Sequence, residues 1–129
     1  MEIGVLGFSE SRNIGDYIQT KAVIDILNKQ NIKILEREKL NNYNGPPIKT
    51  IINGWFMENP KNWPPNNNIN PLFISFHINP SIVKTFINHQ SIEYFKQHEP
   101  IGCRDYYTRD LLLQNGIKAY FSSCVTLGI

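Results

Sequence analysis

The stretch that decides the fold is residues 2–36, EIGVLGFSESRNIGDYIQTKAVIDILNKQNIKILE. Residues 2–8 are apolar, and the polar residues 9–15 that follow them are typical of a loop after a buried strand. From Asp16 the apolar side chains recur every three or four residues, which places them on one face of a helix. Residues 32–36 are apolar again. A strand, a helix and a strand within about 35 residues form a βαβ unit, whose right-handed crossover makes the two strands parallel.

The same alternation continues through the rest of the chain. Further strands are expected at residues 49–53, 71–78, 101–104 and 117–121. Three further helices are expected, with N-caps at Asn79, Ser91 and Asp105 and ends at Pro100 and Asn115-Gly116. Strands that are nearly continuous in apolar residues and alternate with helices favour a parallel sheet that is covered on both faces. We therefore predict one α/β domain over residues 1–129, with a Rossmann-like, mostly parallel sheet.

Composition excludes several classes of protein. Of the 129 residues 41% are hydrophobic and 19% are charged, and the net charge is +2, which are the values of a globular domain. The basic residues are scattered, so no nucleic-acid partner is expected. The amino terminus has no basic region before its apolar run, and no apolar stretch approaches the ~20 residues that span a bilayer. Cys103 and Cys124 are too few and too far apart for a disulfide framework or a metal site, so we expect a reduced, cytoplasmic compartment.

Residues 54–70 form the least regular stretch, with several prolines and a run of asparagines. Long loops inside a compact domain are usually functional or disordered. This one also contains Trp55 and Trp63, so part of it is expected to pack against the domain. The two tryptophans could serve as packing or as a platform on which a sugar stacks.

In an open parallel sheet, ligands bind outside the carboxyl ends of the strands. The polar segments that fall there are residues 9–16, 53–56, 75–79 and 104–105. In the first of them, Gly15 would let a ligand approach the backbone, and the helix that begins at Asp16 offers N–H groups to an anion. The segment is neither a Walker A loop nor a G-x-G-x-x-G motif, so it does not indicate nucleotide binding. Alternatively, Asn13 and Asp16 only satisfy backbone groups.

His77 lies near the end of the apolar strand 71–78. Simple alternation places it on one face with Phe73 and Ser75, opposite Phe76. A histidine there could act as an acid or base near neutral pH, and it could equally be a hydrogen-bonded structural residue.

Arg104 and Asp105 follow the next strand directly. A guanidinium at that place suits a carboxylate or a phosphate, and an ion pair of Arg104 with Asp105 or with another acid is the alternative. Cys103 has no histidine partner at a recognisable spacing, which favours a small core residue over a nucleophile.

Three stretches in register resemble one family, the polysaccharide pyruvyl transferases. Residues 13–22, NIGDYIQTKA, resemble the family's N-x-G-D-x-I-Q opening. Residues 102–112, GCRDYYTRDLL, resemble its C-R-D-x-x-T-x-x-L-L segment, and residues 116–127, GIKAYFSSCVTL, resemble its G-I-x-A-Y-F-S-G-C-L-T-L stretch. Ser123 stands where the family usually has glycine.

The resemblance implies one half of a two-domain fold of the GT-B glycosyltransferase type. The chain's length covers the amino-terminal domain, and a second α/β domain, absent here, would supply much of the phosphoenolpyruvate site. Members transfer an enolpyruvyl group from phosphoenolpyruvate to a sugar diol and form a cyclic ketal. The implied partners are phosphoenolpyruvate, a sugar or polysaccharide precursor, and a second α/β domain or another copy of the chain. No metal and no cofactor is implied.

On this basis the candidate substrate-binding residues are Asn13, Gly15, Asp16, His77, Arg104 and Asp105. His77, Asp16 and Arg104 are also the candidates for catalysis, with no acid or base assigned among them. The resemblance favours an enzyme. A non-catalytic sugar-binding or interaction domain is the chief alternative, and a flavodoxin-like or receiver-type domain is disfavoured because its acidic cluster and phosphate loop are missing.

Overall fold

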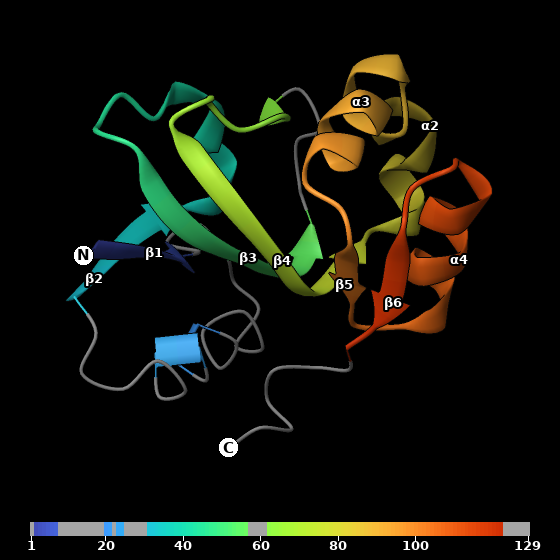
Figure 1. The fold of residues 1–129 in the computed structure, drawn as a ribbon, viewed down its shortest axis with the longest axis horizontal. Coiled ribbons are helices and arrows are strands. Elements are labelled where there is room, and N and C mark those ends of the chain that lie inside the picture. The colour runs from blue at the N-terminus through green and yellow to red at the C-terminus, as the bar shows by residue number, and fades with distance from the viewer. Residues whose placement is uncertain (1, 8–19, 22, 25–30, 57–61, 123–129) are drawn as a thin grey trace.

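The computed structural model of the chain describes residues 2–7, 20–21, 23–24, 31–56 and 62–122. Within these residues six strands form one sheet in the order β2-β1-β3-β4-β5-β6, and all neighbouring strands are parallel (Figure 1). The strands are β1 (Glu2–Gly7), β2 (Asn31–Glu36), β3 (Ile48–Phe56), β4 (Ile69–Ile78), β5 (Ile101–Cys103) and β6 (Ala119–Phe121). The Rossmann-like α/β fold class predicted from the sequence is therefore confirmed.

Helices lie against both faces of the sheet. The helical elements with defined bounds are η1 (Arg37–Asn42), η3 (Pro80–Ile82), α2 (Val83–Phe86), α3 (His89–Gln97) and α4 (Tyr106–Gln114). Phe86, Phe95 and Leu112 from α2, α3 and α4 are fully buried in one large core with Leu6 of β1. The next residue of β1 toward the amino terminus, Val5, points to the other face and packs against Val23, which is helical. This alternation explains why β1 is apolar at consecutive positions.

The predicted helix ends are partly corrected. Helix α3 begins after Asn88, whose side chain accepts a hydrogen bond from the Ser91 N–H at 2.9 Å, so the prediction that Ser91 is the N-cap is wrong. Asn88 is the cap in place of Ser91 because asparagine is an equally good N-cap residue, and it lies one turn earlier in the chain. The helix ends at Gln97, before Pro100. Asp105 caps α4, and Gly116 follows its C-cap with φ 76°, both as predicted.

The irregular stretch after β3 contributes to the core through Trp63. Strand β3 continues to Phe56, residues 57–61 lie outside the described residues, and Trp63 is 8% exposed. Its ring centroid lies 4.9 Å from that of Phe86 and 5.5 Å from that of Phe95. Trp63 is therefore a packing residue, and the alternative of a sugar platform at Trp63 is wrong. Nothing is described of the Trp55 side chain.

The strand order reverses between β1 and β3, because β2 lies on the far side of β1. In open parallel sheets a ligand site is expected at the carboxyl ends of the strands near such a reversal. The carboxyl end of β4 is next to that of β3, with His77 of β4 opposite Trp55 of β3 in the register. In the part of the chain that the structure describes, no helix is long and apolar enough to cross a membrane.

Candidate functional site at the carboxyl ends of β4 and β5

Two of the predicted polar segments meet at one edge of the sheet. His77 is the penultimate residue of β4, and Arg104 and Asp105 directly follow β5. The two strands are joined there, since the Arg104 N–H donates to the Phe76 carbonyl at 2.8 Å. The structure thus brings His77, Arg104 and Asp105 together. Asn13, Gly15 and Asp16 lie outside the described residues.

A β-bulge sets the direction of His77. Between β3 and β4 the register shifts after the pair Ile52–Phe73, so that Gly54 pairs with Phe76. Ser75 lies in the bulge, where β4 has one residue more than β3, and its φ of 54° is in the left-handed region. After the bulge, the side chains of β4 alternate between the two faces with the order shifted by one residue. Phe76 therefore lies in the same core as Phe73, with ring centroids 5.1 Å apart. The predicted grouping of His77 with Phe73 on one face is therefore wrong, because a bulge shifts every later side chain by one position.

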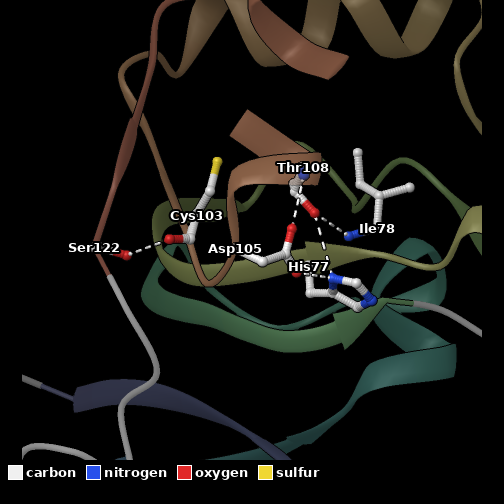
Figure 2. A network of polar contacts seen from close by, with 6 residues as sticks. All are labelled: His77, Ile78, Cys103, Asp105, Thr108 and Ser122. Atoms are coloured by element: carbon white, nitrogen blue, oxygen red, sulfur yellow. Dashed lines mark hydrogen bonds and ion pairs between the residues drawn. The ribbon is translucent and has the colours of Figure 1, made fainter. Parts of the chain in front are cut away.

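His77, Asp105 and Thr108 form a hydrogen-bonded network (Figure 2). The Asp105 carboxylate contacts His77 Nδ1 through one oxygen and accepts from the Thr108 N–H at 2.7 Å through the other. Thr108 Oγ1 lies 3.3 Å from His77 Nδ1 and accepts from the Ile78 N–H at 3.1 Å. These contacts of Asp105 and Thr108 join helix α4 to strand β4 at His77.

The network assigns the proton on the His77 ring. Nδ1 faces the Asp105 carboxylate, which when ionised can only accept a hydrogen bond, so Nδ1 carries the hydrogen in the neutral ring. Nε2 then has a free lone pair. Figure 2 shows this second ring nitrogen on the side of the ring away from Asp105 and Thr108.

The local charges keep the His77 ring neutral. Burial lowers the pKa of His77 below its ordinary value of 6.5, the Arg104 guanidinium lowers it further, and the charge and hydrogen bond of Asp105 only partly oppose this. For Asp105, burial raises the pKa, but the hydrogen bonds from Thr108 and the contact with His77 outweigh it and the pKa is lowered overall. The site therefore presents an ionised carboxylate behind a neutral imidazole near pH 7, which is the arrangement of a general base.

Arg104 provides a cation beside this base. Its charge reaches His77, as the lowered pKa of His77 shows. Asp105 is engaged by His77 and Thr108, and within the described part of the chain no ion pair joins Arg104 to Asp105. That Arg104 meets an anionic group of a ligand stays a prediction.

Cys103 is excluded as a nucleophile. Its side chain is fully buried, and burial raises the pKa of the thiol to about 12. The sulfur donates to the Ile101 carbonyl at 3.4 Å and points away from His77 (Figure 2). The prediction of a core residue is confirmed. Cys124 lies outside the described residues, and among those described no group of three or more His, Cys, Asp or Glu side chains could hold a metal ion.

Thr108 was not among the residues predicted for the site. Its signal is present in the sequence, because the helix cap at Asp105 fixes the residue three positions later beside the capping carboxylate. Thr108 is that residue, and it is fully buried. Ser122, which contacts β4 and β5, has no such local signal, since its partners lie on other strands.

Comparison with protein families gives one match: the model of the polysaccharide pyruvyl transferase family matches residues 13–129. This range contains all three stretches on which the resemblance was recognised and nearly the whole chain. No curated protein and no solved structure matches the chain in the corresponding comparisons. The chain belongs to the polysaccharide pyruvyl transferase family.

Proposed function

Because the chain belongs to this family, we propose that it takes part in the transfer of a pyruvyl group from phosphoenolpyruvate to two hydroxyls of a sugar, which forms a ketal and releases phosphate. The observation that carries the proposal is the pair of His77 and Asp105 at the carboxyl edge of the sheet, in which Asp105 contacts Nδ1 and leaves Nε2 unprotonated. A sugar hydroxyl attacks carbon only if a base removes its proton. Nε2 is a base of suitable protonation state at this edge.

The reaction must move two protons. The diol loses both of its hydroxyl hydrogens; one ends on the methylene carbon of phosphoenolpyruvate, which becomes a methyl group, and the other leaves with the phosphate. In the proposal His77 Nε2 accepts a proton from the attacking hydroxyl, and Asp105 stabilises the imidazolium that results. The Asp105 carboxylate contributes most at this moment, because it contacts the nitrogen opposite the one that is protonated.

Arg104 is the proposed contact for an anionic group of phosphoenolpyruvate. A guanidinium binds carboxylates and phosphates through paired N–H donors. Phosphoenolpyruvate carries both groups, so one guanidinium does not neutralise it. Further cationic groups are therefore required, which a second α/β domain of the GT-B type or another copy of the chain would supply.

The test is release of phosphate from phosphoenolpyruvate in the presence of a pyranoside with a free hydroxyl pair, with the ketal identified by mass spectrometry. His77→Gln is expected to lower kcat by about 10²- to 10⁴-fold, the range of general base catalysis. Arg104→Gln is expected to raise KM for phosphoenolpyruvate. His89→Gln, which changes an exposed histidine of α3, is the matched control and should keep full activity.

Two results would contradict the proposal. The first is wild-type activity in His77→Gln. The second is a folded protein that binds both phosphoenolpyruvate and the pyranoside but releases no phosphate, which would favour the non-catalytic sugar-binding role.

A further inference from the structure

The bulge in β4 places Ser75 in a backbone conformation that serine rarely adopts. Other contacts must therefore stabilise this conformation. Ser75 has φ 54° and is 1% exposed. A side chain in the left-handed region crowds the backbone, and a buried N–H needs an acceptor. The register shift removes the regular ladder partner at this position.

The acceptor comes from the far end of the sequence. The Ser75 N–H donates to Ser122 Oγ at 2.8 Å, across 47 positions of sequence. Ser122 follows β6 directly, and β6 is separated from β4 by β5. The Ser122 hydroxyl thus contacts the bulge of β4, although β5 lies between β4 and β6.

Ser122 is itself fixed by β5. Its N–H donates to the Cys103 carbonyl at 2.8 Å, and its hydroxyl lies 3.3 Å from the same oxygen (Figure 2). Since the hydroxyl hydrogen is directed to Cys103, the oxygen lone pairs remain for the Ser75 N–H. Cys103 in turn pairs with Phe76, the residue between the bulge and His77.

Gly102 leaves the space that this bridge needs. A Cβ atom at Gly102 would lie 2.9 Å from the Phe73 carbonyl oxygen and 3.1 Å from Ser122 Oγ. Any larger residue would therefore crowd both the β4 backbone and the serine hydroxyl. Gly102 and Ser122 belong to two of the three stretches that resemble the family motifs, and they meet at the bulge.

We propose that Ser122 is a positioning residue for His77: its hydroxyl holds Ser75 in the left-handed conformation and so determines on which side of β4 the imidazole emerges. This inference rests on the proposed function, in which His77 is the base. Without the bulge, plain alternation would place His77 on the face of Phe73, inside the core. With it, His77 meets Asp105 and Thr108.

The test is nuclear magnetic resonance of the histidine ring nitrogens in the whole chain, which contains only three histidines. In the wild type, the neutral His77 ring should show hydrogen on Nδ1. In Ser122→Ala this signature should be lost, because the ring no longer meets the Asp105 carboxylate that fixes the hydrogen on Nδ1. Arg104, Asp105 and Thr108 face His77 and are unchanged in this variant.

Two variants serve as controls. Ser122→Thr keeps the hydroxyl and should keep the His77 signature. Ser91→Ala removes the hydroxyl of another buried serine, on α3, and should leave all three histidines unchanged. In the phosphate-release assay, Ser122→Ala should lower kcat about 10- to 100-fold with little change in KM, as expected for a misplaced base.

An unchanged His77 signature in a folded Ser122→Ala variant would overturn the inference. If this variant does not fold, Ser75→Gly/Ser122→Ala decides, since glycine adopts positive φ without support: a folded double variant supports the inference, and an unfolded one overturns it. The ring signature does not depend on catalysis. If the wild type released no phosphate but Ser122→Ala still lost the signature, the proposed function would fail while the positioning of His77 by Ser122 would stand.

Discussion

At the scale of single residues, His77 lies between opposing influences. Burial and Arg104 favour its neutral form, while Asp105 favours its charged form, and the first two prevail. The sequence predicted that His77, Arg104 and Asp105 would meet, because strand ends converge in a parallel sheet. It did not predict which of them would pair, since that depends on the direction in which each side chain leaves its strand.

The lowered pKa of His77 has a consequence for stability. Because its pKa is lower in the folded chain than in the unfolded chain, the unfolded chain binds more protons once the pH falls below about 6.5. Stability should therefore be fully present above that pH and should decrease as the pH falls toward the folded pKa. Asp105 acts in the same direction at lower pH, since its folded pKa is also lowered. We expect the urea-unfolding free energy to fall between pH 7.5 and 5.5.

His77→Gln should flatten that dependence in part. Part of the remaining dependence of the unfolding free energy on pH should come from His98, whose pKa is also lowered by burial. His98→Gln should remove that part. A slope that is the same in His77→Gln as in the wild type would show that the imidazole is not held neutral in the folded chain.

At the scale of elements, the local signals predicted the cap of α4 but misplaced that of α3, and the long-range contacts left no signal in the sequence. The cap of α4 at Asp105 and its end at Gly116 were predicted, because both depend on residues a few positions apart. The bulge in β4 was not predicted, and it reverses the face on which His77 lies. The Ser75 N–H at the bulge donates to Ser122, 47 positions away, and no short window of sequence contains such a contact.

The end of α4 gives a prediction on backbone conformation alone. A Cβ atom at Gly116 would meet nothing closer than the end of the Lys96 side chain at 3.8 Å, so space is open there. Gly116→Ala should nevertheless lower the unfolding free energy by about 1–2 kcal/mol, because φ is 76°. Gly116→Asn should lose less, since asparagine tolerates the left-handed region better. Urea unfolding measures both, and equal losses would point to packing instead.

At the scale of the whole molecule, the parallel sheet was predictable because each βα alternation leaves a clear periodic pattern. The tryptophans of residues 54–70, which include the connection between β3 and β4, also predicted that part of this stretch packs against the domain, but the partners of Trp63 could not be predicted because they lie on other elements. Trp63 lies in that connection and packs against rings of β4, α2 and α3, with centroid distances of 4.9–6.2 Å to Phe73, Phe76, Phe86, Tyr94 and Phe95.

This cluster predicts that Trp63 joins the sheet to its helical layer. Trp63→Ala should lower the unfolding free energy by about 3–5 kcal/mol, the range for removal of a large buried aromatic side chain. That is a large part of the ~5–15 kcal/mol of a typical domain. Trp63→Phe, which keeps a ring in the cluster, should lose much less. Urea unfolding followed by circular dichroism measures the difference. A loss below about 1 kcal/mol in Trp63→Ala would show that the helices are held on β4 without it.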